Sequence, residues 1–388
     1  MYISDLTLSA FRAHDDFKIS FGERINLITG PNGIGKTNLL EAIHYLCLTK
    51  SFVSARDATA IREGSDEFVI RGRFVDGGTQ SRSVSLQYSK ATGKTLQVNK
   101  ATVERVTGHV GLLPVVVFSP DDYGITAGGP EERRRFLDNM LCQASKTYLA
   151  DLQNFRHALK QRNSLLVQAT SHTATFRSQL DAWSSEVVRH GARVINRRRT
   201  DISLINSYLH DSLEQLGLAN EVPEMRYRSV PVGDVDRGTS SGGRDLSLEE
   251  IEERYFEALV EAGSNDMARR RTSVGPHRDE LELFVNGRPL RNYASQGQHR
   301  TFAMALKLAK YHYLYKLCET KPILLLDDAF DHLDPERIAG YIHLIQDKLE
   351  CQAFITTANP GVIESIVQWG DPNRHFNLSV MIGALEKE

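Results

Sequence analysis

The sequence has few cysteines and no long apolar run, and each shortage excludes a class of protein. Its 388 residues include four cysteines, which lie far apart without paired ligand spacing, so neither a disulfide framework nor a zinc site is indicated. No stretch approaches the roughly 18 consecutive apolar residues that a membrane span requires. The opening MYISDLTLSAF alternates like a strand instead of carrying a basic and then apolar export signal. These features predict a cytoplasmic protein with no membrane partner.

The sequence also lacks a large excess of one charge. Lys and Arg total 47 against 49 Asp and Glu, and the formal net charge is −2. This balance argues against a uniformly basic nucleic-acid-binding protein but allows separate basic and acidic patches. Charge therefore has to be examined segment by segment.

The order of periodic segments predicts an α/β domain that is split by an insertion. The first part alternates like strands, the middle shows apolar residues every three or four positions like an antiparallel helical arm, and the last part returns to strand and helix patterns. A Gly-, Ser- and Asp-rich stretch at 230–247 is typical of a linker. An Asn286-Gly287 pair between alternating runs predicts a hairpin. The predicted boundaries are 1–125 and 266–388 for the two halves of the split domain and 126–265 for the inserted arm.

The segment GPNGIGKT at residues 30–37 matches the phosphate-binding loop of nucleotide hydrolases. An apolar strand pattern precedes it and a helical pattern follows it, which is the context that this loop requires. Its glycines allow turns that direct backbone N–H groups at phosphate oxygens, its lysine counters their charge, and its threonine can ligate Mg²⁺. The residues predicted to bind ATP here are Gly30, Pro31, Asn32, Gly33, Ile34, Gly35, Lys36, Thr37 and Asn38.

Two acids end a buried strand pattern, ILLLDD, at residues 323–328. Burying carboxylates is costly unless a cation or a water network receives them. We therefore assign Asp327, with Thr37, to Mg²⁺, and Asp328 to orienting or deprotonating the water that attacks the γ-phosphate. Lys36 is the second residue assigned to catalysis. The alternative for the acid pair is an ordinary cap on the following turn.

A second anion-binding site is predicted at ASQGQHR, residues 294–300, just before a long helical pattern. A serine hydroxyl, a glycine backbone and a helix N-terminus together can hold an anion. An N-capped helix with no further role is the alternative. The residues of this signature segment are Ser295, Gln296, Gly297 and Gln298.

The phosphate loop, the signature segment and the acidic strand resemble, in this order, the ABC ATPase superfamily. The opening of the chain is similar to the head domains of its chromosome-maintenance and DNA-repair branch. Within that branch, three longer segments resemble the RecF family of DNA replication and repair proteins: FSPDDYGITAGGPEERRRFLDNML at 118–141, TSVGPHRDELELFVNG at 272–287 and LLLDDAFDHLDPER at 324–337. The resemblance implies an ABC-type ATPase head split by an inserted helical arm or lid domain, with ATP and Mg²⁺ as cofactors.

The resemblance also implies a function. It implies a weak, DNA-dependent ATPase that forms a homodimer with ATP, the signature segment of one copy completing the ATP site of the other. It further implies binding to single-stranded, linear double-stranded and gapped DNA, recombinase loading with RecR- and RecO-type mediators, and support of the SOS response. By the same resemblance Asp331 and Asp334 belong to the D-loop, and Arg12 and Thr357 to the ATP site, with Thr356 as the alternative to Thr357 as γ-phosphate sensor.

The sequence departs from the superfamily at several points, and other functions stay open. Asp328 stands where most ABC ATPases have Glu, a threonine stands where a sensing His is common, and the usual Q-loop Gln is not visible. The alternatives are another chromosome-maintenance or nuclease-associated ATPase, or a transporter motor subunit. The segment after Asp334 is short for an added nuclease domain, and a transporter motor predicts no DNA binding.

Two arginine-rich segments are predicted to contact DNA phosphates, one within the helical arm and one just after it. The alternative is that they are solvated faces paired with the acids at 249–257. The predicted DNA-binding residues are Arg189, Arg193, Arg197, Arg198, Arg199, Arg270, Arg271 and Arg278.

Overall fold

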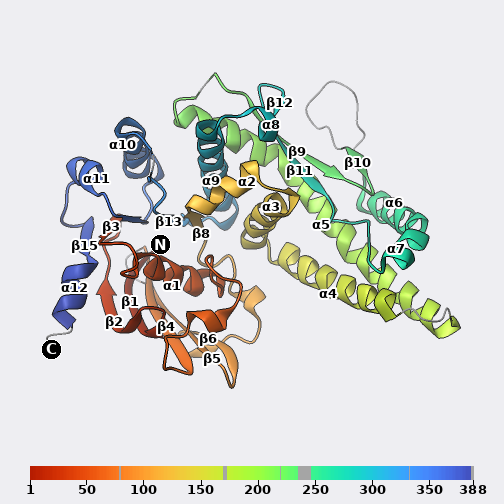
Figure 1. The fold of residues 1–388 in the computed structure, drawn as a ribbon, viewed down its shortest axis with the longest axis horizontal. Helices are drawn as coiled ribbons and strands as arrows, with labels where there is room; N and C mark the ends of the chain where they lie inside the picture. Colours follow the sequence, from red (N-terminus) through yellow and green to blue (C-terminus); the bar gives the residue numbers. More distant parts are fainter. Residues whose placement is uncertain (78–79, 169–172, 219, 235–245, 332, 386–388) are drawn as a thin grey trace. The chain divides into compact units, whose positions relative to one another are not determined.

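The computed structural model describes residues 1–77, 80–168, 173–218, 220–234, 246–331 and 333–385 (Figure 1). Most of the linker predicted at 230–247 lies outside these ranges. The chain divides into two compact units, Met1–Asp122 with Lys310–Glu388, and Tyr123–Ala309. Strands and helices are mixed, in agreement with the predicted α/β class. No helix in the described part of the chain is long and apolar enough to cross a membrane.

The second boundary differs from the predicted one at 265/266. Residues 266–309 belong to the inserted unit, because β11 (Glu280–Val285) pairs with β9 (Pro223–Ser229) in a sheet of that unit. The side chain of Asp266 is buried in the same unit, in an ion pair with Arg162. The insertion therefore includes the signature segment, so its predicted place in the second half of the head is wrong.

The first unit contains an antiparallel sheet of six strands in the order β2-β1-β4-β5-β6-β7. Its strands are β1 (Tyr2–Phe11), β2 (His14–Ser20), β4 (Glu67–Asp76), β5 (Gln80–Ser89), β6 (Gly93–Val98) and β7 (Ala101–Thr102). β1 and β4 bury alternate side chains in their middle stretches. This alternation is typical of a sheet with one face on the core.

A parallel sheet of five strands in the order β15-β3-β14-β13-β8 positions the candidate site. Its strands are β3 (Ile25–Thr29), β8 (Val115–Phe118), β13 (Ile323–Asp327), β14 (Ala353–Thr357) and β15 (Arg374–Asn377). The four strands other than β15 are buried throughout, as expected for parallel strands covered on both faces. The carboxyl ends of β3, β13 and β14 therefore meet at one edge of the sheet.

Helix α1 (Lys36–Leu48) lies between the two sheets of this unit, because it packs on strands of both, β1, β4 and β5 on one side and β13 and β14 on the other. Leu39, Leu40 and Ile43 are fully buried in this core. The remaining helices of the unit are short: α10 (Pro335–His343) with a π-helical continuation at Leu344–Leu349, α11 (Gly361–Ile366) and α12 (Leu378–Leu385), and 3₁₀ turns at Asp57–Ala60, Val106–Gly108 and Pro120–Asp122.

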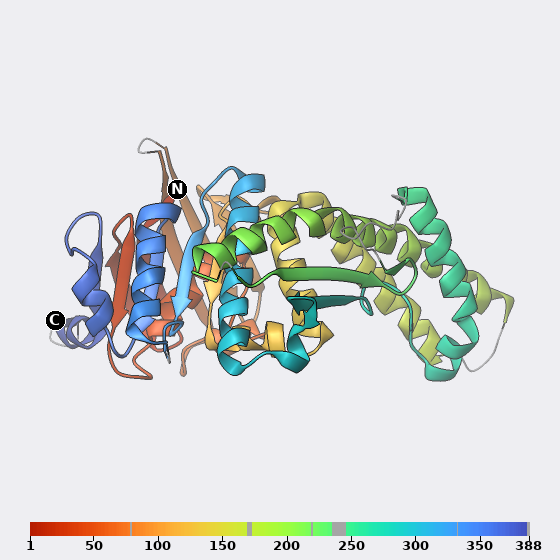
Figure 2. The ribbon, with the colours of Figure 1, turned by 90° about the horizontal axis from the view of Figure 1, so that it is seen from above.

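The second unit contains the predicted helical arm. Helix α5 (Ala174–Gln215) packs against α4 (Lys146–Gln168), α6 (Leu248–Glu261) and strand β9 (Figure 2). Its apolar residues at helical spacing, among them Val187, Val194 and Ile205, are buried. The other helices are α2 (Tyr123–Ala127), α3 (Pro130–Ala144), α7 (Gly263–Arg269), α8 (Leu290–Tyr293) and α9 (Gln296–Cys318), which continues into the first unit.

The sheet of the second unit has the order β10-β9-β11-β12, with β10 at Gly233–Asp234 and β12 at Arg288–Pro289. The hairpin predicted at Asn286-Gly287 is confirmed, since β11 pairs antiparallel with β12. Both turn residues have positive φ, 49° and 72°, as the tight hairpin turn requires.

Candidate nucleotide-binding site

The phosphate loop joins the carboxyl end of β3 to α1, and its conformation requires glycine. Gly30, Gly33 and Gly35 have φ of 144°, 84° and 105°, values that other residues rarely adopt. At Gly35 space is also closed, because a Cβ would lie 2.7 Å from Nε2 of His14. The loop can therefore turn its backbone N–H groups toward one point at the start of α1.

Lys36 is buried and folded back over this loop. Its Nζ donates to the carbonyl oxygen of Gly30 at 2.9 Å and lies 3.3 Å from that of Pro31 and 3.4 Å from Oδ1 of Asn32. These partners are neutral oxygens. These oxygens do not neutralise the positive charge of the ammonium, which is therefore available to an anion at the loop, as the predicted contact with the β- and γ-phosphates requires.

The structure brings together the two residues predicted to hold Mg²⁺. Oγ1 of Thr37 donates to Oδ1 of Asp327 at 2.8 Å. Asp327 is buried, and burial raises the pKa of its carboxyl, while hydrogen bonds from Thr37 and Thr356 oppose this rise. A divalent cation would offset the free energy of burying the ionised carboxylate. A hydroxyl and a carboxylate oxygen are hard ligands, so the donor set fits Mg²⁺.

Asp328 follows directly, in a left-handed backbone conformation with φ of 44°. Its backbone N–H donates to Oγ1 of Thr356 at 2.9 Å. The same hydroxyl lies 2.9 Å from Oδ1 of Asp327. Among the described residues, Thr357 makes no hydrogen bond with either acid, and its Oγ1 accepts from the backbone N–H of Asn359 at 3.0 Å. Of the two threonines that the sequence offered as sensor, the alternative, Thr356, is the one that contacts the acid pair.

Arg12, predicted to contact ATP, makes a two-point ion pair with Glu41, a buried glutamate in the middle of α1. Its Nε and Nη2 donate to the carboxylate oxygens of Glu41 at 2.9 and 2.7 Å, and its Nη1 donates to the carbonyl of Thr59 at 2.8 Å. Hydrogen bonding to Glu41 raises the pKa of the guanidinium. The guanidinium thus fixes α1 to the end of β1, and a contact of Arg12 with nucleotide stays a prediction.

His14 is the residue of this site that the motifs do not mark. It is buried, and its Nε2 lies 3.3 Å from the carbonyl oxygen of Gly35. Burial lowers the pKa of the imidazole, so the ring beneath the loop is neutral at neutral pH. The signal available in the sequence was the alternation of β2, where His14, Phe17 and Ile19 are buried and the residues between them are exposed.

The signature segment forms the N-terminus of α9 in the second unit. The backbone N–H of Gln298 donates to Oγ of Ser295 at 3.2 Å, and the backbone N–H of Ser295 donates to Oε1 of Gln298 at 3.0 Å. This is a capping box, so the N-capped helix offered as the alternative is present. The residues from Ser295 to Gln298 are exposed, and the end of this 23-residue helix is open to an anion from another molecule.

The D-loop residues, Asp331 and Asp334, directly precede α10. Asp334 caps this helix, because its Oδ1 accepts from the backbone N–H of Arg337 at 2.9 Å. The backbone N–H of Asp331 donates to the carbonyl of Asp328 at 3.2 Å, which ties the loop to the acid pair. His332, between them, lies outside the described residues.

The structure contradicts DNA contact by Arg198 and Arg199, which are 2% and 3% exposed. Arg198 donates to Oδ1 of Asp138 at 2.7 Å and to the carbonyl of Pro276 at 2.8 Å. Successive helix residues are rotated by about 100°, so a run of three arginines cannot share one face. This rotation turns Arg198 and Arg199 inward and leaves Arg197 partly exposed.

The other predicted DNA-binding arginines fall into two groups. Those on α5 are at least partly exposed, but each faces an acid: Arg189 with Glu186, Arg193 with Asp151 and Arg197 with Asp201. Those after α7 are exposed, and no ion pair involves them within the described ranges. Nε2 of His277 lies 3.1 Å from the carbonyl oxygen of Thr272. This contact brings together the backbone next to Arg278 and the backbone next to Arg271. We call this group the arginine patch: Arg270, Arg271 and Arg278.

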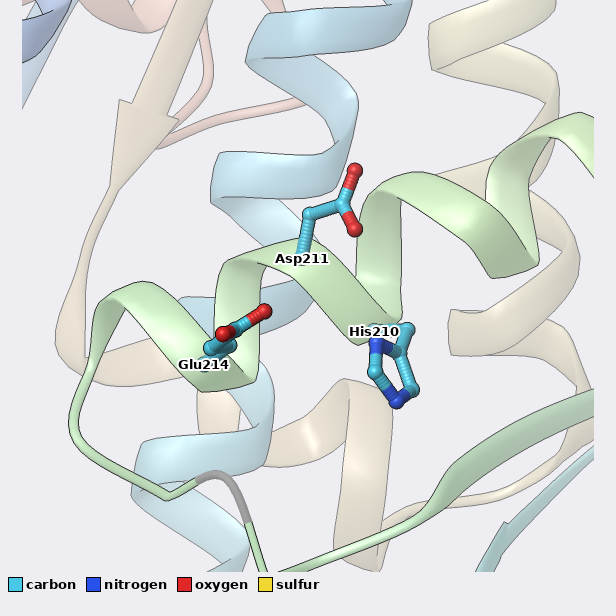
Figure 3. A group of neighbouring side chains, drawn as sticks. All are labelled: His210, Asp211 and Glu214. Atoms are coloured by element: carbon cyan, nitrogen blue, oxygen red, sulfur yellow. The ribbon is translucent and has the colours of Figure 1, made fainter.

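A group of possible metal ligands on α5 carries no argument for a site. His210, Asp211 and Glu214 are exposed, and their ligand atoms lie within 4.8 Å of one another (Figure 3). All three come from adjacent turns of one helix, where exposed acidic groups are common without a metal.

Comparisons with known proteins agree with this geometry. The family described as RecF/RecN/SMC N terminal domain matches residues 2–370. The chain is similar to the DNA replication and repair protein RecF of Salinibacter ruber, with 39% identity over 384 residues, 99% of this chain and 91% of the relative. It is 38% identical to RecF of Chloroherpeton thalassium over 92% of this chain and 95% of the relative. A solved structure described as the recombination mediator protein RecF-ATPrS in the RecFOR pathway has a TM-score of 0.84 at 29% identity, with 93% of both chains covered.

Proposed function

The chain belongs to the RecF family, whose fold is an ABC-type ATPase head with an inserted helical arm, and we propose that it is an ATP-dependent DNA replication and repair protein. In this proposal ATP closes a homodimer on single-stranded, linear double-stranded or gapped DNA, and slow, DNA-dependent hydrolysis reopens it. RecR- and RecO-type mediators are the proposed partners in recombinase loading, and SOS induction is the proposed consequence. The contact between Thr37 and Asp327 beside the phosphate loop is the observation that carries the proposal.

The chain's own groups have distinct parts in hydrolysis. The backbone N–H groups of the phosphate loop after Pro31 and the ammonium of Lys36 bind the phosphates, and Thr37 and Asp327 would hold Mg²⁺. Bound Mg²⁺ would supply neutralisation of the charge on the β- and γ-phosphate oxygens. Asp328 orients the attacking water and accepts its proton. Aspartate in place of the usual glutamate shortens the reach of this base by one methylene, which fits slow turnover.

The exposed end of α9 supports closure of a dimer around ATP. The hydroxyl oxygen of Ser295 accepts from Gln298, so its proton is available to donate to a phosphate. The N-terminal N–H groups of α9 add a partial positive charge. In the proposed dimer, Ser295 and Gly297 of one copy contact the γ-phosphate that lies on the phosphate loop of the other copy.

A test follows from this division of one site between two copies. One copy has a mass of 43.6 kDa, and sedimentation equilibrium should show twice this mass with saturating ATP and Mg²⁺. Ser295→Arg should keep ATP binding and lose the dimer. Ser207→Arg, which places the same charge on an exposed serine of α5, should dimerise like the wild type. A wild-type protein that stays monomeric at saturating ATP and hydrolyses it at full rate would refute the proposed dimer.

A further inference from the structure

One buried hydroxyl connects the two acids of the candidate site. Thr356 lies at the end of β14 and is 1% exposed. Its Oγ1 accepts from the backbone N–H of Asp328 at 2.9 Å. The same atom is 2.9 Å from Oδ1 of Asp327, 3.4 Å from Oδ1 of Asp328 and 3.5 Å from the carbonyl oxygen of Leu326.

The single proton of this hydroxyl can be assigned from these distances. A hydroxyl has one donor and two lone pairs, and one lone pair of Thr356 already accepts from Asp328. The shortest distance to an acceptor directs the proton to Oδ1 of Asp327. Oδ1 of Asp327 therefore receives two hydroxyl protons, from Thr356 and from Thr37 at 2.8 Å.

The two hydrogen bonds to Oδ1 determine which oxygen of Asp327 is available to bind a cation. Within the described part of the chain, Oδ2 of Asp327 makes no hydrogen bond. Two donors on Oδ1 fix the rotamer of the carboxylate and leave Oδ2 for a cation or its water ligands. Thr356 thus acts on the cation site without being one of its ligands.

The same hydroxyl acts on Asp328 through the backbone. At φ of 44° Asp328 is in the left-handed region, which is sparsely populated by residues other than glycine and persists where surrounding contacts hold it. The N–H of Asp328 donates to Thr356 in this conformation. Losing that acceptor would leave a partly buried N–H unpaired and would allow the backbone to relax, which would move the carboxylate.

We propose that Thr356 is a positioning residue for ATP hydrolysis, whose hydroxyl sets the Asp327 carboxylate toward Mg²⁺ and the Asp328 carboxylate toward the attacking water. This inference rests on the proposed ATPase function. It assigns to one threonine on β14 the positioning of both acids.

The test compares Thr356→Val, which keeps the shape and removes the hydroxyl, with Thr356→Ser, which keeps the hydroxyl. We expect kcat of Thr356→Val to fall about 10-fold or more. A ten-fold fall corresponds to about 1.4 kcal/mol, which the loss of one hydrogen bond to a charged group is large enough to cause. KM for ATP should change less than about 3-fold, because the phosphate loop is untouched. Thr356→Ser should keep kcat within about 3-fold of the wild type.

A second measurement does not depend on hydrolysis. Binding of Mg²⁺ with a non-hydrolysable ATP analogue stabilises the folded state, and the Mg²⁺ concentration at half of the maximal rise in Tm reports the cation site. This midpoint should rise about 10-fold in Thr356→Val and stay near the wild-type value in Thr356→Ser. A purely structural role would lower Tm without nucleotide and leave the midpoint unchanged.

The outcomes separate this inference from the proposed function. A wild-type protein that neither binds nor hydrolyses ATP refutes the proposed function. Wild-type kcat and Mg²⁺ midpoint in Thr356→Val, in an active protein, refute the positioning role, and so does a larger loss of kcat in Thr357→Val than in Thr356→Val. If Thr356→Val does not fold, Thr356→Cys replaces it, since a thiol is a weak hydrogen-bonding group, and equal kcat in the Cys and Ser variants overturns the inference.

Discussion

The arginine patch is the surface on which the DNA-binding proposal can be tested most directly. We consider the triple variant Arg270→Gln, Arg271→Gln, Arg278→Gln, which removes three charges and keeps long polar side chains. These side chains are exposed and have no acidic partner among the described residues, so no ion pair has to break before a phosphate binds. The patch should therefore contribute its full charge to DNA binding.

The magnitude follows from counterion release. Each neutralised phosphate contributes about 0.9 to the slope of log K against log salt for duplex DNA, so three lost contacts reduce the slope by about 2.7. Between about 50 and 200 mM salt this difference changes the ratio of wild-type to variant affinity about 40-fold. The loss should be greatest at low salt.

The assay is fluorescence anisotropy of a labelled gapped duplex across this salt range, with a non-hydrolysable ATP analogue present. The triple variant Arg189→Gln, Arg193→Gln, Arg197→Gln should reduce the slope less, because each of these arginines forms an ion pair with an acidic side chain. Arg135→Gln is the matched control, since this exposed arginine pairs with Glu131 at 3.1 Å and lies outside both groups. An unchanged slope in the patch variant, with unchanged ATP binding, would refute DNA contact by the patch.

Two further predictions concern the stability of the second unit in urea unfolding. Arg162 and Asp266 form an ion pair of 2.8 Å with 3% and 0% exposure, so Arg162→Met should lower the free energy of unfolding by about 3–5 kcal/mol, whereas Arg135→Met should cost less than about 1 kcal/mol. Equal losses would contradict this reasoning. Burial lowers the pKa of His277 to about 4, so the unfolded state takes up this proton first, and acidification from about pH 6.5 to 4 should remove up to about 3 kcal/mol. The pH dependence should flatten in His277→Asn, and an unaltered profile would rule out this role.

Local patterns were sufficient for the elements that carry the phosphate loop. Continuous apolar runs gave β3 and β13, and a glycine-rich segment between strand and helix gave the loop, because each depends on neighbouring residues alone. Thr356 could not be distinguished from Thr357 in this way. Neighbouring residues of a strand point to opposite faces, and a strand buried on both faces has no polar side from which to choose.

The arginines of α5 show the same limit for helices. Arg198 can be buried because its guanidinium donates hydrogen bonds to Asp138, 60 residues earlier in the chain, and to the carbonyl oxygen of Pro276. The sequence predicts the helix, but the rotation of its faces is fixed by partners in other elements. Counting basic residues in a helical run therefore overestimates the charge that DNA can reach.

The segment at 272–287 supported recognition of the family, yet most of its polar groups stabilise the second unit. Asp279 is fully buried and accepts from the hydroxyl of Tyr227, and Oγ1 of Thr272 accepts from Arg162 at 2.6 Å. A buried polar group is costly unless every partner is present, so these positions are constrained by folding as strictly as a catalytic site is by chemistry. Resemblance over this segment therefore identifies the architecture. Arg278 within this segment and Arg271 directly before it are exposed, so the proposal assigns DNA contact to these two and not to the buried network.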